Sequence, residues 1–198
     1  MPDDHYFSTS PAAPSRPHEV DLVLPDLRLT LAADRGVFSS RGVDPGTVEL
    51  LRATPAPPDG DLLDLGCGYG PIACALAVRA PRSTVWAVDV NERALSLTAA
   101  NAERIGASNL RAAAPDRVPP EVTFSAIWSN PPIRVGKAAL HDMLVTWLRR
   151  LEPAGSAWLV VHHNLGGDSL ARWLEGEGWA ARKVSSRKGY RILRVSRP

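Results

Sequence analysis

The segment Asn130-Pro131-Pro132-Ile133 combines residue types that could hold a reacting amino group. Its two prolines restrict the backbone to a rigid extended turn, so the Asn130 side-chain oxygen and the Pro131 carbonyl keep their directions. Each oxygen can accept one N–H of an aromatic or amide-type NH₂, whose lone pair is otherwise delocalised. The nitrogen would then face a methyl carbon, with its developing positive charge stabilised. The segment therefore predicts methyl transfer to nitrogen without a strong base.

A glycine-rich turn, Asp64-Leu65-Gly66-Cys67-Gly68-Tyr69-Gly70, separates a short apolar stretch from a helical pattern. Glycine permits positive φ and lets a ligand approach the backbone closely. The nicotinamide fingerprint GxGxxG would need glycine at position 71, where Pro71 stands, and the Lys-Ser/Thr pair of a phosphate-binding loop is missing. The remaining interpretation is the S-adenosylmethionine-binding turn of class I methyltransferases.

Two carboxylates accompany this turn. Asp89 ends the next predicted strand, nineteen residues after Gly70, where a carboxylate can accept hydrogen bonds from both ribose hydroxyls of an adenosine. We count Asp89 and the adjacent Val90 as cofactor-binding positions. Asp64 has two open interpretations, since it could reach the ligand's amino group through water or only orient the turn. Cys67 is included among the cofactor-binding positions, although its side chain is more typical of packing than of a nucleophile.

No other chemical centre is predicted. His162 and His163 end an apolar stretch and could face a pocket, but paired histidines at a strand end are more often structural. No spacing of His, Cys and carboxylates indicates a metal site, so we expect none. We assign Trp86, Trp128 and Trp158 to the core because each lies in a strand pattern.

Strand-like and helix-like segments alternate along the chain. The pattern predicts a short hairpin over 20–24 and 27–32, and a helix from Asp44-Pro45 to Arg52. Alternation predicts an α/β, Rossmann-like fold: a mostly parallel seven-stranded sheet with helices on both faces and an antiparallel C-terminal strand pair. Ligands of such sheets bind at the carboxyl ends of the strands, where the motifs above fall. The expected strands are 62–65, 84–88, 110–114, 124–128, 157–161, 180–185 and 191–195, and the expected helices are 71–79, 91–105, 138–151 and 168–175.

Length and composition indicate one globular domain. The chain has 198 residues, 44% of them hydrophobic and 22% charged, which excludes wholesale disorder. We expect an extended arm over 1–18 and a single domain over 19–198, divided into a hairpin and helix (19–53) and the Rossmann-like core (61–198). Two cysteines without a disulfide pattern, and no apolar run of membrane-spanning length, favour a cytoplasmic protein.

Charge is distributed unevenly. Residues 1–177 hold 16 basic and 21 acidic residues, whereas the last 21 residues hold seven basic residues and no acidic one. Such asymmetry is typical of a segment that contacts an anionic partner. A solvated basic strand face is the alternative interpretation, and charge alone does not decide between them.

The order of these motifs resembles the RsmC-like "methyltransferase small" domains, over about residues 5–195. The resemblance implies an S-adenosylmethionine cofactor and methylation of a guanine N2 in small-subunit ribosomal RNA, with that RNA or the assembling small subunit as partner. Many relatives place an aromatic residue at the position of Ile133, so base stacking would come from elsewhere, such as Phe38. The motifs that carry the resemblance are Gly36-Val37-Phe38-Ser39, Asp44-Pro45-Gly46-Thr47, the segment from Asn130 to Lys137, and Lys188-Gly189-Tyr190-Arg191.

The resemblance also assigns residue roles. Asn130, Pro131, Pro132 and Ile133 would hold the guanine amine. Gly66, Gly68, Gly70 and Asp89 would bind the cofactor, which Phe38 would flank together with the target base. Asp116 is the nearest candidate for the acid that contacts adenine. Basic residues near the motifs, Arg134, Lys137, Arg187, Lys188 and Arg191, are the expected RNA contacts.

Two alternatives remain open from the residues. The acceptor could be another amino or amide group, on a protein glutamine, an adenine or a small molecule. A non-catalytic scaffold that kept the fold is the other. We expect no membrane contact and favour a monomer.

Overall fold

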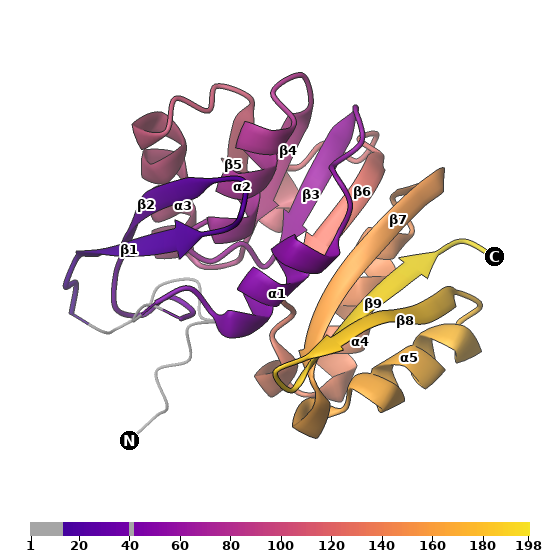
Figure 1. Cartoon of the computed structure of the whole chain (residues 1–198). Coiled ribbons are helices and arrows are strands. Elements are labelled where there is room, and N and C mark those ends of the chain that lie inside the picture. The colour runs from indigo at the N-terminus through magenta and orange to yellow at the C-terminus, as the bar shows by residue number, and fades with distance from the viewer. Residues whose placement is uncertain (1–13, 40–41) are drawn as a thin grey trace.

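A seven-stranded sheet forms the centre of the protein, whose computed structural model describes residues 14–39 and 42–198 (Figure 1). The strand order is β5-β4-β3-β6-β7-β9-β8, with parallel pairing among the first five. β9 runs antiparallel to both β7 and β8. This arrangement confirms the predicted Rossmann-like fold. The strands are β3 Asp61–Leu65, β4 Thr84–Val88, β5 Leu110–Ala113, β6 Phe124–Ser129, β7 Leu151–His162, β8 Ala180–Arg187 and β9 Tyr190–Ser196.

Helices cover both faces of the sheet. Side chains of α1 and α2 pack on one face, where α3 also lies, and those of α4 and α5 pack on the other. Three short 3-10 helices, η1 Pro115–Arg117, η2 Ile133–Val135 and η3 His163–Leu165, follow strand ends. The α-helices are α1 Pro45–Ala53, α2 Pro71–Arg79, α3 Glu92–Arg104, α4 Lys137–Leu148 and α5 Gly167–Gly176.

Two helices begin where their capping residues predict. The Asp44 side chain accepts hydrogen bonds from the backbone N–H groups of Gly46 and Thr47, and Pro45 occupies the first position of α1. Asn91 caps α3 in the same way. Each cap is the last residue of the loop before its helix, so it fixes how that loop enters the helix.

The predicted hairpin consists of β1 His18–Val23 and β2 Arg28–Ala33, paired antiparallel outside the main sheet. The buried Asn101 of α3 ties it to the domain, because its side chain bonds both the N–H and the carbonyl of Ala32. The same amide donates to the carbonyl of Tyr69, in the glycine turn, at 2.8 Å. The arm expected over 1–18 lies largely outside the described residues.

The predicted helix over 138–151 was too long. α4 ends at Leu148, and Leu151 already begins β7, paired with Phe124. Pro153 disfavours helical backbone at the preceding residue and has no N–H for a strand ladder. The register accordingly shifts before regular pairing resumes between Ala126 and Ser156. The strand expected over 157–161 is therefore the second half of a longer one.

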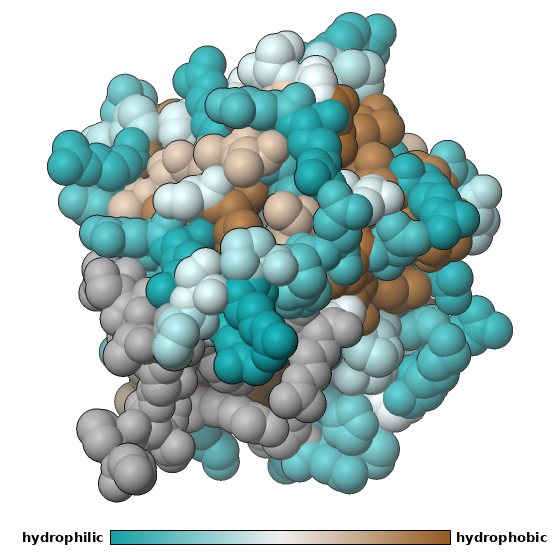
Figure 2. All heavy atoms as spheres, turned by 90° about the vertical axis from the view of Figure 1, so that its left-hand side faces the viewer, coloured by the Kyte–Doolittle hydropathy of each residue, from teal (hydrophilic) through white to brown (hydrophobic). Residues whose placement is uncertain are grey.

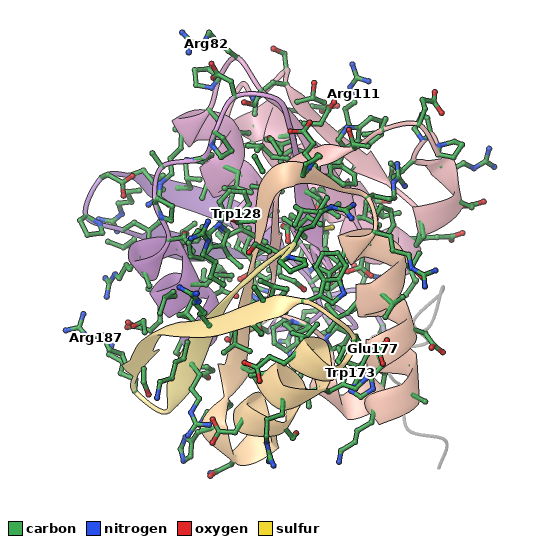
Figure 3. The ribbon with its side chains drawn as sticks, turned by 90° about the vertical axis from the view of Figure 1, so that its right-hand side faces the viewer. Arg82, Arg111, Trp128, Trp173, Glu177 and Arg187 are labelled. Carbon is green, nitrogen blue, oxygen red and sulfur yellow. The ribbon has the colours of Figure 1, made fainter. Side chains whose placement is uncertain are left out.

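The core lies on both sides of the sheet. Trp86, Trp128 and Trp158 are buried as predicted, and Trp128 lies in the middle of the molecule (Figure 3). Hydrophilic side chains cover much of the face that carries β1, β2 and α3, with apolar groups between them (Figure 2). Among the described residues, no helix is long and apolar enough to cross a membrane.

Candidate active site

A cavity of about 460 Å³ opens at the carboxyl edge of the sheet, where the sequence motifs come together. Its walls come from the residues that follow β3, β4, β5 and β6, from the end of β7, and from Tyr190 of β9. This position is the one that parallel α/β sheets use for ligands. Of the residues predicted to bind the cofactor or the acceptor, the lining includes Phe38, Gly66, Gly68, Asp89, Val90, Asn130, Pro131, Pro132 and Ile133.

The glycine turn forms one wall of this cavity. Gly66 and Gly68 have φ values of 76° and 57°, which favour glycine. A Cβ atom added at Gly66 would come no closer than 3.9 Å to Pro132, and one at Gly68 no closer than 4.0 Å to Phe38. The backbone here is therefore bare beside open space, which fits close approach of a cofactor. Gly70 differs, because a Cβ atom there would lie 2.9 Å from Thr98, within the packed interior.

Backbone N–H groups fix Asp89 at the cavity wall. Its carboxylate accepts hydrogen bonds from Gly68 and Asn91, both at 2.9 Å. Burial raises the pKa of Asp89, although these hydrogen bonds act in the opposite direction. A carboxylate has about four acceptor sites, so Asp89 retains capacity for hydroxyl groups of a ligand. These remaining acceptor sites fit the hydroxyl groups on the ribose of the predicted cofactor.

Asp64 and Cys67 lie behind the turn and do not line this cavity. The fully buried Asp64 accepts a hydrogen bond from the N–H of Ala73, in the first turn of α2, at 2.9 Å. Burial raises the pKa of Asp64 to about 8. This geometry favours the second of its two interpretations, in which the side chain orients the turn. The Cys67 thiol packs 3.7 Å from the Thr98 hydroxyl. Burial raises the pKa of this thiol.

The amide of Asn130 has a fixed orientation. Its Nδ2 donates to Oδ1 of Asp44 at 3.0 Å and to Oγ1 of Thr47 at 3.1 Å. An ionised carboxylate only accepts hydrogen bonds, so the NH₂ group must face Asp44 and the amide oxygen must face away from it. Sequence reasoning assigned Asp44 only to the cap of α1. The Asp44-Pro45-Gly46-Thr47 motif was the available signal, but the partnership itself depends on the fold.

The diproline segment ends in a tight turn. Pro132 has φ −73° and ψ 78°, close to an inverse γ-turn, and the N–H of Ile133 donates to the Pro131 carbonyl at 2.9 Å. A carbonyl has two lone pairs, so that of Pro131 can accept one further hydrogen bond. Pro131 is buried and Ile133 is half-buried at the cavity. The segment thus has the rigidity that its sequence predicts.

The aromatic side chain of Tyr190, to which the sequence assigned no role, also lines the cavity. Tyr190 packs against Gly46, where an added Cβ atom would lie only 2.6 Å from the ring. Its ring also meets that of His162 edge-on, with centroids 5.1 Å apart, and both residues line the cavity. His162 therefore lies at the cavity, and the wall that it forms with Tyr190 has an aromatic face.

Other predicted contacts lie outside the cavity. The exposed Asp116 carboxylate lies 3.8 Å from Arg117, and the preceding Pro115 lines the cavity instead. Lys188 pairs with Glu49 at 3.1 Å, and Arg191 pairs with Asp168. Lys137 and Arg187 are exposed, and the Arg134 side chain lies outside the described part of the structure.

Comparison with known proteins decides the family, because the sequence model of the methyltransferase small domain matches residues 28–194. The chain belongs to the methyltransferase small domain family. It is 34% identical to the uncharacterized protein YbxB of Bacillus subtilis, over 98% of both chains. It is 32% identical to ribosomal RNA small subunit methyltransferase C (RsmC) of Hahella chejuensis, over 82% of this chain and 48% of that protein.

Solved structures agree with this family. The structure of the T. thermophilus 16S rRNA N2 G1207 methyltransferase, RsmC, in complex with AdoMet and guanosine, superposes with a TM-score of 0.80 and 24% identity. The alignment covers 95% of this chain and 52% of that one, so this chain spans about half the length of its RsmC relatives. The family and fold confirm the predicted methyltransferase with S-adenosylmethionine as cofactor.

Proposed function

We propose that this methyltransferase small domain transfers a methyl group to the N2 amine of a guanine in small-subunit ribosomal RNA. The observation that carries the proposal is the fixed amide of Asn130 beside Pro131, at the wall of the same cavity as the glycine turn. RsmC relatives, named for small-subunit ribosomal RNA, support the nucleic-acid acceptor. An RNA substrate places the protein in the cytoplasm, where we expect it to act as a monomer.

The cofactor half of the cavity is formed by the glycine turn and Asp89. S-adenosylmethionine, when bound, supplies an activated methyl carbon. Gly66 and Gly68 would accept it against their bare backbone, and Asp89 would accept hydrogen bonds from its ribose. Phe38, whose Cβ faces Gly68, would flank it. The half-exposed Val90 and the backbone near Pro115 complete this wall.

The acceptor half would hold the amine by two oxygens. The amide oxygen of Asn130 accepts one N–H, and the free lone pair of the Pro131 carbonyl accepts the other. Asp44 and Thr47 prevent the amide from rotating, so its oxygen needs no reorganisation as positive charge develops on the nitrogen. As the N–C bond forms, the bond between the methyl carbon and sulfur would break with its electron pair left on sulfur, and the amine would then lose one proton to water. No side chain has to act as a base.

Tyr190 would provide the aromatic contact that Ile133 does not. Tyr190 lies beside Gly46, two residues from Asp44, and therefore close to the residues that hold Asn130. Phe38 lies instead beside Gly68, on the cofactor side. We propose Tyr190 as the stacking partner of a base that enters the cavity with its amine at Asn130.

Methyl transfer to ribosomal RNA from cells that lack this enzyme tests the proposal, with labelled methyl groups traced to individual nucleotides. Asn130→Ala should reduce kcat by about 10²–10³, typical for loss of one transition-state acceptor or donor. Calorimetry should show unchanged cofactor affinity, and Asn164→Ala, at an exposed amide, should behave as the wild type. Label in protein rather than RNA would reject the acceptor. Full activity of Asn130→Ala would reject the mechanism.

A further inference from the structure

The β8–β9 hairpin distributes the C-terminal basic residues over two faces of the sheet. Arg182 lies opposite Arg194, and Arg187 lies opposite Tyr190. These residues share a face with Ile192, which packs in the cluster that includes α1, because side chains alternate along a strand. Lys183 lies opposite Leu193, on the face that packs against α5.

Acidic partners neutralise Arg191, on the α5 face, and Lys188, at the hairpin tip. Arg191 pairs with Asp168. The hydrogen bond and charge of Arg191 lower the pKa of Asp168, and the charge of Lys183 contributes. Lys188, at the tip, pairs with Glu49 of α1. These contacts reduce the charge that Lys188 and Arg191 offer to a partner, although both were expected to bind RNA.

On the α1 face, the positive charge is not neutralised. Within the described residues, no carboxylate lies at ion-pair distance from Arg182, Arg187 or Arg194, and all three are exposed. We call these three residues the arginine face. β8 and β9 themselves contain no acidic residue.

Two members of the arginine face are placed by specific contacts. The Nε of Arg194 donates to the Ser156 hydroxyl at 3.1 Å, and its guanidinium lies over the Trp158 ring, 5.8 Å from the centroid. This leaves the other guanidinium N–H groups available for an oxygen ligand. Arg187 extends outward from the end of the hairpin (Figure 3).

A hollow of about 520 Å³ continues the surface from Arg187 toward α1. Arg52 and Arg79 line it together with one acidic residue, Asp26. Both oxygens of Asp26 are taken by Arg79, at 2.8 Å each. Arg52 lies 3.9 Å from a carboxylate oxygen of Glu49, whereas Arg187, also in this lining, has no carboxylate at ion-pair distance among the described residues.

The arginine face is continuous with the cavity. Arg187 is the cross-strand partner of Tyr190, which lines the cavity. From Tyr190 to Arg194 the strand spans roughly 13 Å at ~3.3 Å per residue. A nucleic acid strand whose base enters beside Tyr190 can thus continue directly over these arginines.

We propose that the arginine face binds the phosphodiester backbone of the RNA whose base enters the cavity; the proposal rests on the proposed function. The planar guanidinium group matches phosphate oxygens in a bidentate manner. Each neutralised phosphate releases counterions, so the contact must weaken as salt increases. The core of a protein–protein interface is depleted in charged residues, so a surface made of three exposed arginines favours a polyanion such as RNA.

Fluorescence anisotropy with a fluorescein-labelled RNA stem-loop, between 50 and 200 mM salt, tests this surface. The triple variant Arg182→Gln, Arg187→Gln, Arg194→Gln should bind about tenfold or more weakly at intermediate salt. The slope of log K against log salt is negative, and its magnitude should decrease by about 2–3 in this variant, since each phosphate contact contributes about 0.9. The matched control removes the same charge at three exposed arginines elsewhere, Arg111, Arg117 and Arg172, and should change affinity less than twofold.

Three outcomes overturn the proposal: a wild type that does not bind the stem-loop, an unchanged slope in the triple variant, or an equal loss in both triple variants. Unchanged calorimetric affinity for S-adenosylmethionine establishes that the variants are folded. The proposed function fails separately. If the wild type binds RNA through these arginines and yet methylates only protein or small molecules, the surface stands and the acceptor assignment does not.

Discussion

Asp44 accepts a hydrogen bond from the side-chain amide of Asn130 at 3.0 Å, across 86 residues of sequence. The same Oδ1 atom caps α1 through the N–H of Gly46. One carboxylate therefore fixes the start of a helix and the orientation of the amide that we propose to hold the acceptor. This double role couples the N-terminal region to the cavity.

Asp44→Ser should separate these two roles. Serine also caps helices, but its shorter side chain does not reach Asn130, so α1 should persist while the amide loses its orientation. We expect kcat to fall by about tenfold to 100-fold, as for loss of a hydrogen bond to a charged group of ~1.5–3 kcal/mol. Thr47→Val should cost about 1 kcal/mol, or roughly fivefold. Thermal unfolding checks the fold, and full kcat in both variants would contradict the role of Asp44.

Gly68→Ala should mainly weaken cofactor binding, whereas Gly70→Ala should mainly reduce stability. At Gly68 the new Cβ atom meets only Phe38, at 4.0 Å, so the fold should lose about 1–2 kcal/mol for the left-handed backbone and the cofactor should bind at least tenfold more weakly. At Gly70 it would lie 2.9 Å from Thr98, in addition to a φ of 89°. This variant should lose more stability than Gly68→Ala. Thermal unfolding without cofactor and calorimetry distinguish the two, and equal stability losses would be inconsistent with this geometry.

Tyr190→Leu should raise the KM for RNA. If the target base stacks on this ring, the loss is about 1–3 kcal/mol, or roughly fivefold to 150-fold. Tyr190→Phe preserves the ring and its contact with Gly46, so its KM should remain within about twofold of the wild type. Steady-state kinetics with a fixed RNA substrate gives both values. Similar kinetics for the Leu and Phe variants would transfer the stacking role to another residue.

Asp64→Asn should change how stability depends on pH. Below about pH 4 both the folded and the unfolded wild type keep the Asp64 proton. As pH rises toward 8, the unfolded chain releases this proton while the folded chain, with a pKa of about 8, retains it. The wild type thus loses stability over this interval. The free energy of unfolding of Asp64→Asn, relative to wild type, should increase from pH 4 to pH 8 in urea titrations; a constant difference would refute the buried, protonated carboxyl.

Local patterns in the sequence were sufficient for the fold class and for the motifs. Caps at Asp44 and Asn91 and the diproline turn depend on neighbouring residues, so their conformations are encoded locally. The glycine turn lies between a strand and a helix for the same reason. The end of α4 was misjudged because Leu151 is apolar at helical spacing but pairs with Phe124 in the sheet.

Contacts between distant segments were decided only by the tertiary structure. The partnership of Asp44 with Asn130, the place of Tyr190 beside the cavity and the exposed position of Asp116 depend on strand order and on how loops cross the sheet edge. Which arginines remain unpaired depends on the register of β8 and β9. A register shift of one residue would exchange the two faces, and no local pattern specifies that register.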